Sequence, residues 1–194
     1  MKIFNSDILI KKTSCNCADL PGHPIPPSVN IFVKVTKGCN AHCAFCSNAG
    51  CQSPTSLFDI EKMIRIIYEL KSKGIIVNRM NITGGEPSVV SPLVVRILDA
   101  IDKEHFDDVH LHLNTNGVTV QAQDLMQHPR WDSISMSLHH YDVNRLSDLY
   151  GCEIPAHLLH FTGVDKQKIN FSCNLIKGYI DNKEEVRKML DLTL

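Results

Sequence analysis

The feature that most constrains the fold is an alternation of apolar and polar residues in three short segments, residues 109–114, 133–138 and 169–175. A period of two predicts β-strands, because successive side chains of a strand point to opposite faces of the sheet. The three segments therefore predict one sheet with an apolar face and a polar face. The polar positions are His110, His112, Asn114, Ser133, Ser135, Ser137, Asn170, Ser172 and Asn174.

Helix signals separate the strand signals along the chain. Two further strands are predicted at residues 31–36 and 77–83, and a helix at residues 183–192 follows the last strand. Strands that alternate with helices predict βαβ units and a parallel sheet, which is an α/β fold.

Two of these helices have recognisable starts. Ser56 is the predicted N-cap of the first, Asp59 lies in its first turn, and Gly74 is its predicted stop. Ser91 and Pro92 are the predicted cap and first-turn residue of the second.

The polar face of the sheet decides between architectures. A parallel sheet covered on both faces has strands that are apolar nearly throughout, and a closed eight-stranded barrel fills its interior with Val, Ile and Leu. The alternating strands fit neither arrangement. We therefore predict a curved, open sheet with helices on its convex side and a polar cavity on its concave side.

Residues 36–51, TKGCNAHCAFCSNAGC, bring Cys39, Cys43 and Cys46 together on a loop directly after the first strand of this sheet. Three closely spaced thiols predict a metal or iron–sulfur site. Structural zinc takes four ligands, usually as two pairs, and iron–sulfur clusters are normally held by four cysteines. Three ligands leave one iron open to a small molecule; Cys51 is an alternative fourth ligand, but it lies five residues further on, outside the compact spacing.

Eight cysteines without a secretion signal favour metal or redox chemistry over a disulfide framework. An auxiliary cluster built from some of Cys15, Cys17, Cys51 and Cys152 is an alternative to ordinary reduced thiols, and Cys173 is predicted to be a small buried residue. The net charge of −1 gives no sign of a nucleic-acid partner. No apolar run approaches the ~20 residues of a membrane span, so we expect a soluble, cytoplasmic protein.

The string CNAHCAFC, together with the Gly-Gly-Glu-Pro of residues 84–87, resembles the CxxxCxΦC and GGE motifs of the radical SAM superfamily. The resemblance implies a partial parallel (β/α)6 barrel. Residues 31–194 are then the core domain, preceded by a Pro-rich extension at residues 1–30. Only five strand–helix units are recognisable, so the last strand of the family is not found. The chain is then a fragment of a longer protein, or a partner or the N-terminal segment covers the open edge.

The resemblance also implies the cofactors and their ligands. Cys39, Cys43 and Cys46 match the ligands of three irons of a 4Fe–4S cluster, whose fourth iron binds S-adenosylmethionine (SAM). The matching SAM-binding positions are Phe45 at the adenine, Gly84, Gly85 and Glu86 at the methionine amino group, Asn114 and Asn116 in the segment LNTNG, Ser137 near the carboxylate, and Asn174 at the ribose or carboxylate.

The implied reaction is reductive cleavage of SAM to methionine and a 5′-deoxyadenosyl radical, which takes a hydrogen atom from an unidentified small-molecule or peptide substrate. It needs an electron donor, such as a flavodoxin- or ferredoxin-like protein, and no side chain acts as an acid or base in the cleavage step. Whether SAM is consumed or regenerated stays open. His139 and His140 stand at the end of the fourth predicted strand of the sheet, where the family commonly has Asp-Gly. They are either substrate contacts or loop residues.

Two other functions stay open at this point. The first is a non-catalytic iron–sulfur protein for electron transfer or sensing, which the intact Gly-Gly-Glu-Pro motif disfavours. The second is a zinc-stabilised binding module, which the lack of a fourth cysteine in the compact spacing disfavours.

Overall fold

The computed structural model describes residues 2–3, 6–7, 27–46, 58–160 and 163–193. Its main element is a five-stranded sheet in the order β3-β4-β5-β6-β7, in which all neighbouring strands are parallel. The strands are β3 (Ser28–Lys34), β4 (Ile76–Thr83), β5 (His110–Thr115), β6 (Ser133–Ser137) and β7 (Ile169–Ser172). The predicted parallel sheet and α/β class are confirmed. Near the N-terminus, β1 (Lys2–Ile3) and β2 (Ser6–Asp7) form an antiparallel pair that the sequence did not predict.

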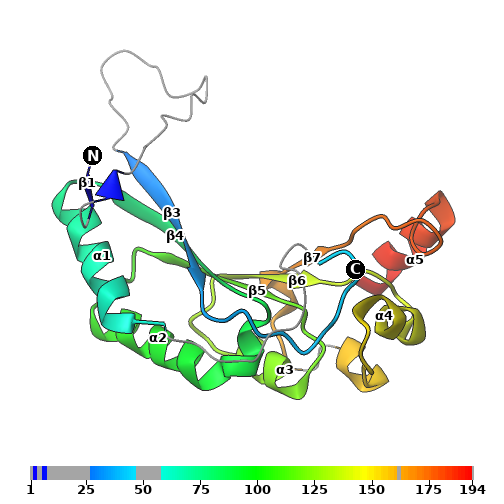
Figure 1. The fold of residues 1–194 in the computed structure, drawn as a ribbon. Helices are drawn as coiled ribbons and strands as arrows, with labels where there is room; N and C mark the ends of the chain where they lie inside the picture. The colour runs from blue at the N-terminus through cyan, green and yellow to red at the C-terminus, as the bar shows by residue number, and fades with distance from the viewer. Residues whose placement is uncertain (1, 4–5, 8–26, 47–57, 161–162, 194) are drawn as a thin grey trace, which may run out of the picture.

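Helices cover one face of this sheet. Figure 1 shows α1, α2 and α3 side by side under the twisted sheet, and α4 and α5 together near its β6–β7 end. The α-helices are α1 (Ile60–Ser72), α2 (Ser91–Lys103), α3 (Val120–Met126), α4 (Val143–Tyr150) and α5 (Lys183–Thr193), and the 3₁₀ helices are η1 (Pro87–Val90), η2 (Ala156–His160) and η3 (Lys166–Lys168). None of the described helices is long and apolar enough to cross a membrane.

Two helix starts differ from the sequence prediction. Ser56 lies outside the described residues, and the N-cap of α1 is Asp59, whose carboxylate accepts a hydrogen bond from the Lys62 backbone nitrogen at 2.9 Å. Ser91 is inside a helical turn and does not cap α2, because η1 leads directly into that helix. Its hydroxyl instead donates to the Ser88 carbonyl at 2.6 Å.

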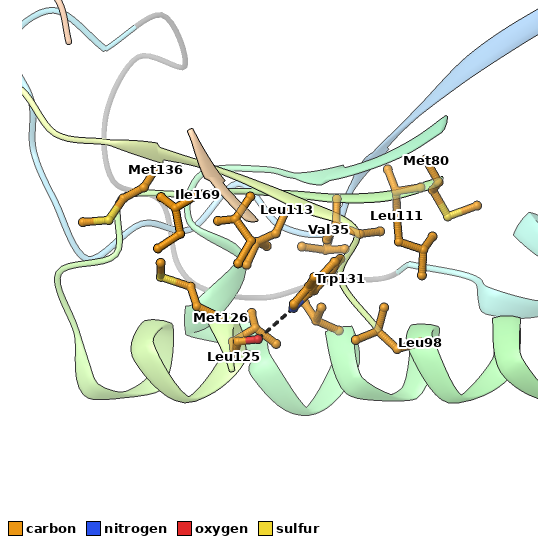
Figure 2. Packing of buried hydrophobic residues seen from close by; sticks show 14 of the residues in the cluster. Val35, Met80, Leu98, Leu111, Leu113, Leu125, Met126, Trp131, Met136 and Ile169 are labelled. Atoms are coloured by element: carbon orange, nitrogen blue, oxygen red, sulfur yellow. Dashed lines mark hydrogen bonds between the residues drawn. The ribbon is translucent and has the colours of Figure 1, made fainter. Parts of the chain in front are cut away.

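The core lies between the sheet and helices α1, α2 and α3. Figure 2 shows apolar side chains from the strands above those of the helices, with Trp131 between them. Trp131 is 1% exposed, and its indole nitrogen donates to the Leu125 carbonyl at 2.8 Å. This hydrogen bond lets the largest side chain of the core be buried without an unpaired donor. The apolar face of the sheet is therefore the face that the helices cover.

The opposite face of the sheet is polar, as predicted. The strand register aligns Arg79 with His110, His112 with Ser133, and Ser135 with Asn170. Residues paired in this way point to the same side of the sheet. The last strand is shorter than predicted, since β7 ends at Ser172 and Leu175 is 72% exposed.

Candidate cofactor site

A cavity of about 340 Å³ lies at the carboxyl ends of the parallel strands. Parallel α/β folds place their binding sites at this edge. All of the site residues predicted from the sequence line the cavity, namely Cys39, Cys43, Phe45, Cys46, Gly84, Gly85, Glu86, Asn114, Asn116, Ser137 and Asn174. The fold therefore brings segments that are far apart in the sequence to one place.

The cysteine loop is attached to the end of β4 through backbone hydrogen bonds. Beyond the end of β3, the Gly85 nitrogen donates to the Thr36 carbonyl at 2.9 Å, and the Glu86 nitrogen donates to the Gly38 carbonyl at 2.8 Å. The loop that carries the thiols therefore continues the β3–β4 pairing. Its position is set by the sheet and not by side chains alone.

This attachment explains the two glycines in a way that the sequence did not show. A Cβ atom at Gly85 would lie 2.1 Å from the Gly38 carbonyl oxygen, and one at Gly84 would lie 2.6 Å from the Thr36 carbonyl oxygen. Both contacts are closer than a Cβ atom tolerates, and both involve backbone. The glycines are thus needed for the cysteine loop to approach β4, whatever contact they make with a ligand.

We expect Gly85→Ala to displace the cysteine loop, because the added methyl group overlaps backbone that cannot turn away. The variant should lose about 2–3 kcal/mol of stability and bind several-fold less iron on anaerobic reconstitution. Gly74→Ala is the control, since Gly74 has a φ of +69° but no atom within 4 Å of an added Cβ. Equal iron binding by the two variants would contradict this role of Gly85.

Two further contacts hold the cysteine loop. The Asn116 side-chain amide donates to the Asn40 side-chain oxygen at 2.8 Å, which ties the loop to the end of β5. The His42 nitrogen donates to the Tyr150 carbonyl at 2.6 Å, which ties it to the end of α4. Asn116 was predicted to touch a ligand; the structure places it on the cavity wall with its side chain bound to the loop.

The three thiols also border a second, smaller cavity. It measures about 80 Å³ and is lined by Cys39, Cys43, Cys46, Gly85, Lys37, Ala41 and His42. Burial and, to a smaller extent, the nearby thiols of Cys39 and Cys46 raise the pKa of the Cys43 thiol to about 11. Among the described residues no three His, Cys, Asp or Glu side chains are arranged to hold a single metal ion. A 4Fe–4S cluster does not require such convergence, because each thiolate binds a different iron.

Glu86 is the most buried charged group of the site, with 1% of its surface exposed. Its Oε1 atom accepts from the Ser88 nitrogen at 3.0 Å and from the Thr115 hydroxyl at 2.7 Å, and its Oε2 atom accepts from the Asn116 nitrogen at 2.7 Å. Burial raises the pKa of Glu86, and these donors oppose the rise. The carboxylate therefore joins the ends of β4 and β5, a role that the sequence did not predict.

Comparison with known proteins places this site in a family. The model of the radical SAM superfamily matches residues 33–192, which include the cysteine loop and all five strand ends. The chain belongs to the radical SAM superfamily. Proteins of this family bind a 4Fe–4S cluster and SAM.

Related sequences of the radical SAM superfamily are enzymes of more than one kind. A probable GTP 3',8-cyclase of Archaeoglobus fulgidus is 30% identical over 100 residues, which are 50% of this chain and 31% of that protein. A probable dual-specificity RNA methyltransferase RlmN of Clostridium botulinum is 23% identical over 171 residues, or 82% of this chain and 49% of that protein. The chain thus spans less than half the length of these relatives.

Solved radical SAM structures share the fold. Streptococcus suis SuiB bound to S-adenosylmethionine has a TM-score of 0.61 at 16% identity, covering 86% of this chain and 38% of that one. The protein anSMEcpe with bound AdoMet has a TM-score of 0.63 at 16% identity, and the match covers 85% of this chain and 48% of that one. These likenesses confirm the partial barrel.

His139, which replaces the Asp of the common Asp-Gly and which the sequence left open as a substrate contact or a loop residue, lines the cavity. Its ring lies edge-on to Phe45, with ring centroids 4.8 Å apart, and edge-on to Tyr150 at 5.7 Å. Tyr150, which sequence reasoning missed, donates its hydroxyl to the Ser137 carbonyl at 2.6 Å. Together these three rings form an aromatic wall of the cavity.

His140 does not line the cavity. It is 1% exposed, and its Nδ1 atom accepts from the Asp142 nitrogen at 2.9 Å, just before α4. Its Nε2 atom has no hydrogen-bond partner among the described residues. Of the two histidines, only His139 is placed to meet a ligand in this cavity.

The protonation state of His139 follows from one hydrogen bond and its burial. The Asn174 nitrogen donates to His139 Nδ1 at 3.0 Å, so the neutral ring carries its proton on Nε2. Burial lowers the pKa of His139 to about 4. The side chain is therefore a neutral donor at physiological pH.

We expect the pH dependence of stability to report this state. Because the pKa of His139 is depressed on folding, its contribution is present above the ordinary value of about 6.5 and is lost as pH falls toward 4. Between pH 7 and 4.5, His139→Gln should lose roughly 1–2 kcal/mol less than the wild type in urea titrations, because solvent partly screens the ring. The exposed His157→Gln serves as control and should follow the wild type. If the stabilities of His139→Gln and the wild type fell equally with pH, His139 would not be held neutral by burial.

Proposed function

We propose that the chain carries the catalytic core of a radical SAM enzyme, with Cys39, Cys43 and Cys46 as ligands of a 4Fe–4S cluster. The observation that supports this best is the pair of adjoining cavities at the strand ends. All three cysteines and Gly85 line both cavities, one of about 80 Å³ and one of about 340 Å³. We assign the smaller cavity to the cluster and the larger one to SAM.

When bound, the reduced cluster and SAM together supply a 5′-deoxyadenosyl radical that abstracts a hydrogen atom from the substrate. The protein itself contributes orientation and exclusion of water. Asn114, Ser137 and Asn174 offer polar groups at neighbouring strand ends, suited to the amino, carboxylate and ribose groups of SAM. The rings of Phe45 and His139 offer an apolar wall for the adenine.

The surroundings of the cysteine loop favour an external electron donor. Phe45 is 38% exposed, and Cys46 is also exposed. A flavodoxin- or ferredoxin-like protein would approach the cluster on this side. Free thiols at the site fit a reducing compartment such as the cytoplasm.

We further propose residues 31–194 as the core domain and residues 1–30 as an extension; the substrate is a small molecule or a peptide.

Electron paramagnetic resonance of the reconstituted, reduced protein tests the cofactor assignment. We expect a reduced 4Fe–4S signal that changes when SAM is added, because SAM would bind next to the cluster. Adenosine lacks the methionine part of SAM, with its amino and carboxylate groups, and should leave the signal unchanged. A cluster signal that is indifferent to SAM would contradict the assignment of the larger cavity.

A further inference from the structure

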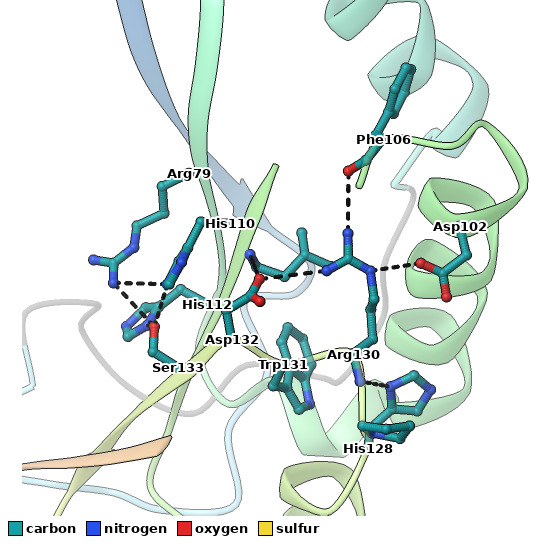
Figure 3. A network of polar contacts seen from close by, with 12 residues as sticks. Arg79, Asp102, Phe106, His110, His112, His128, Arg130, Trp131, Asp132 and Ser133 are labelled. Atoms are coloured by element: carbon teal, nitrogen blue, oxygen red, sulfur yellow. Dashed lines mark hydrogen bonds and ion pairs between the residues drawn. The ribbon is translucent and has the colours of Figure 1, made fainter. Parts of the chain in front are cut away.

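A separate group of polar side chains lies on the polar face of the sheet, away from the cofactor site. Arg79 of β4 places its Nη2 atom 3.1 Å from the Ser133 hydroxyl and 3.3 Å from His110 Nε2. The same hydroxyl lies 2.7 Å from His110 Nε2 and 2.7 Å from His112 Nδ1. Figure 3 shows these four residues converging from three neighbouring strands. We call them the Arg79 cluster.

The hydrogen bonds within the Arg79 cluster leave part of the guanidinium unused. A guanidinium carries five N–H donors, and because Ser133 Oγ and His110 Nε2 lie 2.7 Å apart, one N–H of Nη2 can serve both. The Nη1 and Nε atoms of Arg79 have no hydrogen-bond partner within the described ranges. Four donors thus remain, and the second N–H of Nη2 lies beside a free N–H of Nε or Nη1, in the fork geometry that binds carboxylate or phosphate oxygens in pairs.

The charge of Arg79 is also uncompensated within the part of the chain that the structure describes. No ion pair between described residues involves Arg79, and the five parallel strands contain no Asp or Glu. Arg130 differs, since Asp102 at 2.7 Å and Asp132 at 3.5 Å neutralise it (Figure 3). A partly buried cation without a counterion is costly, so an anion would stabilise this face.

The Arg79 cluster and the cofactor cavity lie on the same face of the sheet. His112 and Asn114 follow each other on the polar face of β5, and Asn114 lines the cavity. Thr83, which also lines the cavity, lies four positions after Arg79 on β4, and this is about 13 Å along an extended strand. A molecule lying along the polar face would reach both places.

We propose that the Arg79 cluster is a binding subsite for an oxyanion group, a carboxylate or a phosphate, of the substrate. The fork of Arg79 would hold the oxyanion, with His110 and Ser133 fixing the guanidinium. The reacting end of the same molecule would then lie at the cavity. That second statement rests on the proposed function, whereas anion binding by the cluster does not. The substrate class is therefore an elongated molecule with an anionic end.

Calorimetric titration of the full chain with inorganic phosphate and with succinate tests the subsite. We expect saturable binding of at least one probe, weakened about tenfold or more by Arg79→Gln because a charge-assisted, paired contact is lost. Arg65→Gln, at an exposed position of α1, should bind like the wild type. Tighter binding of phosphate would indicate a phosphoryl group, and tighter binding of succinate a carboxylate. Unaltered binding by Arg79→Gln, or binding of neither probe, would overturn the proposal.

A second variant separates folding from binding. Arg79→Lys keeps the charge but loses the fork, so it should bind the probe more weakly than wild type and more tightly than Arg79→Gln. The titration is made with and without the reconstituted iron–sulfur centre. Failure to assemble the centre with probe binding intact would count against the proposed function alone. If the wild type carries the iron–sulfur centre but binds neither phosphate nor succinate, this would count against the subsite alone.

Discussion

Replacing Cys39, Cys43 or Cys46 by alanine is expected to abolish binding of the iron–sulfur cluster, each on its own. The three thiols line the same two cavities, and each would bind a different iron. No two of them can substitute for the third, since the loop is fixed by β4, β5 and α4. Iron and sulfide analysis after anaerobic reconstitution, with the visible absorption of the cluster, measures the effect.

Cys173→Ala is the matched control for these variants. Cys173 is half-buried and lies outside both cavities. We expect this variant to assemble the cluster as the wild type does. Wild-type iron and sulfide content in Cys43→Ala would instead show that Cys43 is not a ligand.

Glu86→Gln is expected to destabilise the protein and to disorganise the cavity of about 340 Å³ that we assign to SAM. Each carboxylate oxygen accepts a backbone N–H, from Ser88 on one side and from Asn116 on the other. A glutamine amide can accept on one side only, so either orientation leaves one buried N–H facing another donor. An unpaired buried donor costs about 1–3 kcal/mol. Urea titration should show this loss, and SAM binding should weaken in parallel.

Glu153→Gln controls for the loss of a negative charge, because Glu153 is exposed. It should leave stability and SAM binding unchanged. Glu86→Asp retains the charge but shortens the reach to β5, and we expect an intermediate loss of stability. If Glu86→Gln were as stable as Glu153→Gln, the three donors around Glu86 would not be its partners in solution.

Much of the site was predictable from the sequence, because it depends on backbone topology. Parallel strands bring their carboxyl ends to one edge, so residues at the ends of β4, β5 and β6 had to meet. Cysteine spacing placed the thiols on one loop. The alternation in β5 and β6 predicted the polar face, which the register confirms.

Other features could not be read from the sequence, since they depend on contacts between distant segments. The cap of α1 is Asp59 and not the predicted Ser56, because several neighbouring polar residues can cap a helix and the sequence pattern leaves its first residue open. Gly85 is required by the approach of Gly38, which lies far away along the chain. The link from Glu86 to Asn116, and the convergence of Arg79 with Ser133, likewise require the folded strand order.

The most direct test of radical SAM activity is anaerobic incubation of the reconstituted, full chain with SAM and a strong reductant, followed by measurement of 5′-deoxyadenosine. We expect the wild type to form 5′-deoxyadenosine and Cys43→Ala to form none. A wild-type protein with a fully assembled cluster that forms no 5′-deoxyadenosine would contradict the proposed activity, and would make this chain a non-catalytic carrier of an iron–sulfur cluster.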